Sequence, residues 1–168
     1  VFVEHNGQLV SLISTLPNTF VKNALEQKSL PVYKNYKLIK PEYAIKNHRI
    51  DFLLENQNGK SFYLEVKSVT CVQNGVAKFP DAITKRGLLH LRLLGELVSS
   101  GNQAGVLFVC QRQDPISFQP MWERDPKFSA ALVDAYSIGL KINCITLNIS
   151  KTKITFHKEI SINLAKHN

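Results

Sequence analysis

Extended, apolar-rich stretches separated by polar turn residues dominate the first half of the chain. They cover residues 36–45, 48–56 and 60–69, and such runs bounded by turn residues predict strands. Three in succession indicate an antiparallel meander. Upstream, two shorter β-rich runs flank Asn6-Gly7, a dipeptide that favours a tight hairpin turn. We therefore expect a short N-terminal hairpin within residues 1–15, leading into the meander.

Helical spacing appears in three other segments. From 83 to 100, leucines recur three or four residues apart until Gly101, a residue that commonly ends helices. An earlier helix is expected from Asn18, as its N-terminal cap, to about Gln27. A last helix is expected over 126–137, before Gly139.

The remaining strands decide the fold class. Residues 104–111 are almost wholly apolar, which is typical of a strand buried on both faces. Two more strands are expected over 140–149 and 153–160. A meander, a long crossover helix and a buried strand together predict a mixed α/β sheet. With 168 residues and no repeats or linkers, the chain is expected to form one domain.

Two acidic residues and a lysine on neighbouring predicted strands could carry chemistry. Asp51 stands in RIDFLL, while Glu65 and Lys67 stand in LEVKSV. Residues two apart on a strand share a face, so Glu65 and Lys67 point the same way, and Asp51 can join them across a short loop. With a backbone carbonyl, taken as that of Val66, the two carboxylates would suit Mg²⁺ or Mn²⁺. The alternative is that these are ordinary strand residues, because ExK triplets arise by chance.

Net charge, cysteine spacing and hydropathy limit the partners and the classes of protein that the sequence can represent. The formal net charge of +8 favours an anionic partner such as nucleic acid, or it only keeps a lysine-rich domain dissolved. Three separated cysteines without zinc-site spacing suit a reducing cytoplasm. No apolar run approaches membrane-spanning length, so no membrane partner is expected. Glycine-rich phosphate loops, GxSxG and HExxH are absent, which argues against P-loop, serine-hydrolase and zinc-protease chemistry.

Six stretches, taken in order, resemble the sugar fermentation stimulation protein family: LPNTFVKNALE, HRIDFLLE, YLEVKSVT, GVAKFPDAITKRGLLHLRLL, VLFVCQR and DPKFSAAL. The resemblance covers nearly the whole chain. It implies an α/β fold with a restriction-endonuclease-like core, in which helices flank a mixed central sheet. It also implies a PD-(D/E)XK active site, and Asp51, Glu65 and Lys67 match that motif residue by residue.

The resemblance implies a metal-dependent nuclease that hydrolyses DNA by in-line attack of an activated water and leaves a 5′-phosphate. RNA is the alternative substrate. Glu26 matches the place of an additional catalytic acid in this superfamily, and otherwise it is a solvated helix acid. Five residues around the predicted site are candidates for contact with nucleic acid, or else ordinary polar surface: Lys78, Lys85, Arg86, His90 and Arg112.

Members of the family resemble two-part proteins in which an OB-like barrel precedes the nuclease domain. That barrel is not recognised in this chain, which begins at Val1. A partner chain that supplies an OB-like domain, or a homodimer, is therefore a further expectation. The principal alternative function is a non-catalytic DNA-binding module that regulates sugar-metabolism genes, and a third is an accessory subunit.

Overall fold

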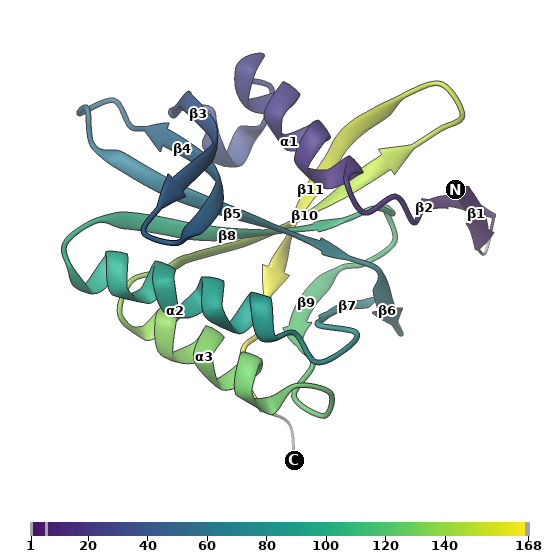
Figure 1. Cartoon of the computed structure of the whole chain (residues 1–168). Coiled ribbons are helices and arrows are strands. Elements are labelled where there is room, and N and C mark those ends of the chain that lie inside the picture. Colours follow the sequence, from purple (N-terminus) through teal and green to yellow (C-terminus); the bar gives the residue numbers. More distant parts are fainter. Residues whose placement is uncertain (1, 6, 167–168) are drawn as a thin grey trace.

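Within residues 2–5 and 7–166, which this computed structural model describes, the chain folds around a nine-stranded mixed sheet (Figure 1). The strand order is β3-β4-β5-β8-β10-β11-β9-β7-β6. The strands are β3 (Lys37–Ile45), β4 (His48–Glu55), β5 (Ser61–Val69), β6 (Cys71–Gln73), β7 (Val76–Phe79), β8 (Gln103–Cys110), β9 (Ser117–Pro120), β10 (Lys141–Ile149) and β11 (Ile154–Ile162).

The predicted meander is confirmed, and it continues into a parallel segment. β3 pairs antiparallel with β4, and β4 with β5. β5 then pairs in parallel with β8, and β8 with β10. A parallel pair requires a crossover connection, and helix α2 (Lys85–Ser99) lies on the segment that joins β5 to β8. The sheet is therefore mixed, as the sequence predicts.

Three short strands at one edge of the sheet were not expected. β6, β7 and β9 contain only three or four residues each, too few for a recognisable alternation. They join the main sheet through β11, whose C-terminal residues Ser161 and Ile162 pair in parallel with β9. β11 therefore links the long strands to this small edge segment.

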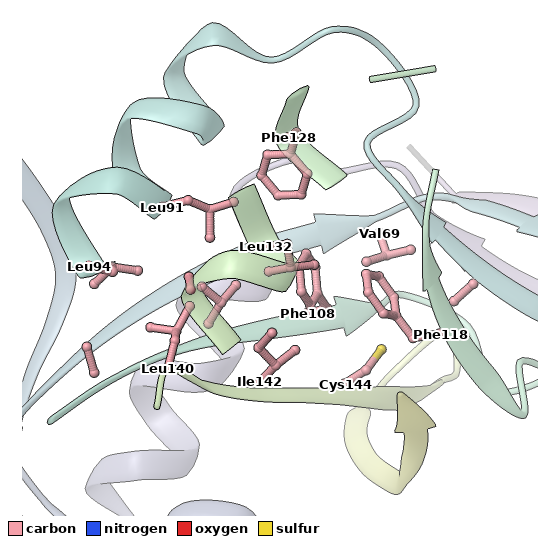
Figure 2. Close-up of a cluster of buried hydrophobic side chains, with 14 of the residues drawn as sticks. Val69, Leu91, Leu94, Phe108, Phe118, Phe128, Leu132, Leu140, Ile142 and Cys144 are labelled. Atoms are coloured by element: carbon pink, nitrogen blue, oxygen red, sulfur yellow. The ribbon is translucent and has the colours of Figure 1, made fainter. Parts of the chain in front are cut away.

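Helices cover both faces of the sheet (Figure 1). Helix α1 (Leu16–Glu26) and a 3₁₀ turn (Pro31–Tyr33) pack on one face, where one hydrophobic cluster lies. Helix α2 and helix α3 (Pro126–Ser137) pack on the other face. Their cluster is shown in Figure 2, where Phe108 and Phe118 from the sheet lie beneath Leu91, Phe128 and Leu132 from the helices. Each such side chain contributes roughly 1.5–3 kcal/mol when fully buried.

The helix starts differ in part from the sequence predictions. α3 begins at Pro126 as expected, and α2 begins at Lys85, two residues after the expected start. Asp125 and Thr84 cap these helices by accepting hydrogen bonds from backbone N–H groups of their first turns. The prediction that Asn18 caps α1 was wrong. Thr15 is the N-cap residue, and Pro17 lies in the first turn, a position that tolerates proline because its N–H has no helical partner there. The Asn18 side chain is thereby free for another contact.

The N-terminal hairpin is present as β1 (Phe2–His5) paired with β2 (Gln8–Ser11). Gly7 in its turn adopts a φ of 75°, which glycine reaches at little cost, while Asn6 lies outside the described residues. None of the helices in the described part of the chain combines the length and the apolar character that crossing a bilayer requires.

Candidate active site

The candidate site lies where the hydrogen-bonded ladder between β4 and β5 ends. Residue pairing runs from Glu55↔Ser61 to Phe52↔Leu64, and the next residue on each strand is Asp51 or Glu65. Beyond that point the Asp51 carboxylate takes the place of a strand carbonyl, because its Oδ2 accepts a hydrogen bond from Val66 N at 2.8 Å. The end of the ladder thus brings both predicted acids into one site.

Asp51 is held by two donors from different elements. In addition to Val66 N, the Asn18 side chain on the first turn of α1 donates from Nδ2 to Asp51 Oδ1 at 2.7 Å. Burial, followed by the charge of Glu65, raises the pKa of Asp51 to about 6, although the two hydrogen bonds and Lys67 oppose this shift. A bound cation would favour the charged carboxylate and so lower that pKa.

Glu65 is almost fully buried, with 3% of its surface exposed. Its Oε1 lies 2.5 Å from Lys67 Nζ and 2.5 Å from His90 Nδ1, whereas its Oε2 is buried and has no hydrogen-bond partner. Burial alone would raise the pKa of Glu65, but the hydrogen bond from His90 and the charge of Lys67 outweigh it and lower that pKa. Glu65 is therefore an ionised carboxylate with one unsatisfied oxygen.

The oxygens at this point fit a divalent cation. A buried carboxylate oxygen without a partner is costly, and a cation would satisfy Glu65 Oε2. Val66 N points toward Asp51, and since the N–H and C=O of one strand residue point to the same side, Val66 O faces that side too. Among the described residues, no group of three or more His, Cys, Asp or Glu side chains could hold a metal. Two carboxylates and a carbonyl suit a cation that keeps several waters, such as Mg²⁺ or Mn²⁺.

Lys67 shares the face of β5 with Glu65, as the strand spacing predicts. Its side chain is 14% exposed, and its Nζ also lies 3.3 Å from His90 Nδ1. A lysine ammonium has three donors, so the contact with Glu65 leaves others for a water or a phosphate oxygen. The site thus combines oxygen ligands with an adjacent positive charge.

Glu26 does not reach this site. It lies eight residues after Asn18 on α1, about 12 Å along the helix axis, and its half-exposed carboxylate is 4.0 Å from Lys22. Its position therefore gives no support to the prediction of a catalytic role. Glu26 is the last residue of α1, whereas the residue of this helix that contacts Asp51 is Asn18, near its start.

The five candidates for nucleic-acid contact fall into three groups. Lys85 and Arg86 are exposed on the first turn of α2, about one turn before His90. His90 is buried against Glu65 and is not a surface residue. Lys78 pairs with Glu123 at 3.2 Å, and Arg112 is 9% exposed and donates two hydrogen bonds to Asp114. The last two cations are therefore already paired.

Sequence reasoning missed three contacts of the site and its surroundings, namely Asn18 with Asp51, His90 with Glu65 and Arg112 with Asp114. Asn18 was interpreted as a cap, yet it positions Asp51, and nothing in the local sequence indicates that contact. The pairing of Arg112 with Asp114 did have a signal, because an acid two residues away is within reach of an arginine side chain. The missed contacts are mainly those between segments distant in sequence.

Comparisons with known proteins cover most of the chain. The family model described as "Sugar fermentation stimulation protein RE domain" matches residues 15–153. A sugar fermentation stimulation protein homolog of Clostridium tetani is 40% identical over 157 residues, which cover 94% of this chain and 68% of that protein. One of Moorella thermoacetica is 38% identical over 164 residues, or 98% of this chain and 71% of that protein.

A solved structure has the same fold. The structure of Pyrococcus furiosus SfsA in complex with Ca²⁺ aligns with a TM-score of 0.89 at 24% identity, and the alignment covers 96% of this chain and 70% of that one. The predicted α/β fold, a restriction-endonuclease-like core with helices flanking a mixed sheet, is thereby confirmed.

Proposed function

Because the chain belongs to the sugar fermentation stimulation protein family, we propose that it is a divalent-metal-dependent nuclease that hydrolyses phosphodiester bonds of DNA. Residues 1–168 would form one nuclease domain. The observation that carries the proposal is the convergence of Asp51, Glu65 and Lys67 at the end of the β4–β5 ladder, with Glu65 Oε2 buried and unpartnered. A structural cluster of acids would be expected to satisfy that oxygen internally.

Asp51, Glu65 and the Val66 carbonyl would hold Mg²⁺ or Mn²⁺, which would lower the pKa of a water and offset negative charge on the phosphate. The relative from Pyrococcus furiosus, whose structure is in complex with Ca²⁺, supports the proposal that this chain binds a divalent cation. Asn18 and Val66 N keep the Asp51 carboxylate oriented. These two donors belong to the fold itself, so they would hold the carboxylate in place for a cation.

Lys67 would orient the attacking water and stabilise the charge that grows on the phosphorus oxygens. Its Nζ is 2.5 Å from Glu65 Oε1, so it lies beside the ligands rather than among them. Removal of this ammonium is therefore expected to reduce cleavage far more than it reduces metal binding.

DNA would approach across the first turn of α2. The formal net charge is +8, and Lys85 and Arg86 are exposed within about one turn of His90, which contacts Glu65. Exposed cations near the cleavage site attract the phosphate backbone without regard to base sequence. Lys78 and Arg112 contribute less to this surface, because acids already pair with them.

The test is cleavage of labelled single- and double-stranded DNA and RNA with Mg²⁺ or Mn²⁺. Asp51→Ala, Glu65→Ala and Lys67→Ala should each lower the cleavage rate at least about 100-fold. Lys60→Ala is the matched control, since Lys60 is an exposed lysine just before β5. If the wild-type protein binds DNA but cuts with neither metal, and the three variants bind equally well, a DNA-binding regulatory module replaces the nuclease.

A further inference from the structure

His90 contacts the candidate metal ligand Glu65 from the helix that packs over it. We infer that His90 is a positioning residue, which holds Glu65 Oε1 so that Oε2 alone faces the cation. This inference rests on the proposed function, because it concerns how the same site orients its metal ligand Glu65. It replaces the expectation that His90 touches the nucleic acid, since its side chain is 8% exposed.

The helix that carries His90 is anchored at its start by Asp125. Asp125 Oδ2 accepts a hydrogen bond from Thr84 N, the N-cap residue of α2, at 2.9 Å, while its Oδ1 accepts from Phe128 N at the start of α3. Gly87 lies one turn before His90, and a Cβ there would be 3.2 Å from the Phe128 ring. The start of α2, which carries His90 one turn later, is thus held in close contact with α3.

The distance between His90 and Glu65 determines which ring atom carries a proton. Nδ1 lies 2.5 Å from Glu65 Oε1, and a lone pair on Nδ1 would repel the lone pairs of an ionised carboxylate at that distance. Nδ1 must therefore be protonated and donate to Oε1. With Nδ1 as a donor, the 3.3 Å contact between Nδ1 and Lys67 Nζ is one between two donors that share Oε1.

The two oxygens of Glu65 are consequently unequal. Oε1 accepts from both Lys67 and His90, whereas Oε2 accepts from neither. If Lys67 turns toward a water or a phosphate, Oε1 keeps the His90 donor and is not left unsatisfied in a buried place. His90 thereby allows Lys67 to leave Glu65 without rotation of the carboxylate, so the cation ligand stays in position.

Calorimetric titration with Ca²⁺ tests the inference without any cleavage. His90→Phe keeps the ring volume but removes the donor, and it should weaken Ca²⁺ binding about 10- to 100-fold, the usual cost of removing a hydrogen-bond partner of a metal ligand. His90→Asn places an amide donor close to the Nδ1 position and should stay within about threefold of wild type by the same reasoning. If His90 only fills space, His90→Phe should instead bind Ca²⁺ more tightly than His90→Asn.

Affinity of His90→Phe within about threefold of wild type would overturn the inference, as would equal weakening of the Phe and Asn variants. If the Phe variant does not fold, ¹⁵N NMR of the wild-type side chains decides, with the His90→Asn spectrum as assignment. A proton on Nδ1 is expected from the contact with Glu65 Oε1, and a ring with Nδ1 unprotonated would refute that contact. Failure of the wild-type protein to bind Ca²⁺ would instead refute the proposed metal site, and the NMR result would still test His90.

Discussion

Replacement of Asp51 by asparagine should change the pH dependence of stability in the metal-free protein. Burial, followed by the charge of Glu65, raises the pKa of Asp51 from 3.8 to about 6. For an acid whose pKa is raised by folding, the folded state binds more protons than the unfolded state. The favourable contribution of the protonated group is therefore complete below pH 3.8 and is lost as the pH rises through about 6. Asparagine does not titrate, so the variant avoids that loss.

The magnitude follows from the difference between the two pKa values. A shift of about two units corresponds to about 3 kcal/mol when the group is fully ionised, of which about 2 kcal/mol develops between pH 4 and 8. Asparagine has one acceptor oxygen, whereas Asp51 accepts from both Asn18 and Val66 N. One donor is thus left unpaired, at about 1–3 kcal/mol. That cost does not depend on pH, so it cancels when two pH values are compared.

The assay is urea unfolding in EDTA at pH 4, 6 and 8. Relative to wild type, the free energy of unfolding of Asp51→Asn should rise by about 2 kcal/mol from pH 4 to pH 8. Glu26→Gln is the control, because this half-exposed acid makes a long ion pair with Lys22 at 4.0 Å and its replacement should change stability by less than about 0.5 kcal/mol. A difference between wild type and Asp51→Asn that stays constant to within about 0.5 kcal/mol across this range would refute the reasoning.

Four further predictions follow from other contacts. Ca²⁺ should raise the melting temperature of the wild-type protein but not that of Glu65→Gln, which lacks the charged oxygen that is unpartnered in the fold; an equal rise in both would place the cation elsewhere. Arg86→Gln should weaken DNA binding and reduce the slope of log affinity against log salt by about one, whereas Arg112→Gln should leave that slope unchanged because Asp114 already pairs with it. Asp125→Ala should lower the free energy of unfolding by about 2–4 kcal/mol in urea titrations, since it leaves the part-buried N–H of Thr84 and the buried N–H of Phe128 without an acceptor. Gly105→Ala should cost about 1–3 kcal/mol in the same assay, because its Cβ would lie 2.8 Å from Phe62 and 3.0 Å from a backbone oxygen; a neutral effect would mean that the strands separate more easily than their packing indicates.

Local sequence patterns predicted most of the elements that frame the candidate site. The helix expected over 83–100 is found at Lys85–Ser99, and the strand expected over 104–111 is found at Gln103–Cys110. Both have strong signals, because leucines at helical spacing and an unbroken apolar run each admit few other structures. By contrast, β7 and β9 depend on pairing with each other and with β11, and four residues carry too little pattern to predict that.

The residues around the acids were less predictable than the acids themselves. His90 was placed correctly on a helix near the site but was expected at the surface, since a histidine on an amphipathic helix gives no sign of its neighbours. The structure buries it against Glu65 instead. Arg112 was a candidate for contact with nucleic acid, and in the structure Asp114 pairs with it. Side-chain partners depend on which segments meet, and that is a property of the whole fold.

The amino-acid sequence by itself determined that Glu65 and Lys67 share a face, because successive side chains on a strand alternate whatever surrounds it. It also determined that a helix follows the meander, through the spacing of its leucines and the stop at Gly101. Only the tertiary structure decided that the β4–β5 ladder ends beside Asp51, and that α1 and α2 bring Asn18 and His90 to the two acids. The reason is that backbone periodicity acts over a few residues, whereas the site is built from segments that only the packing of helices on both faces of the sheet brings together.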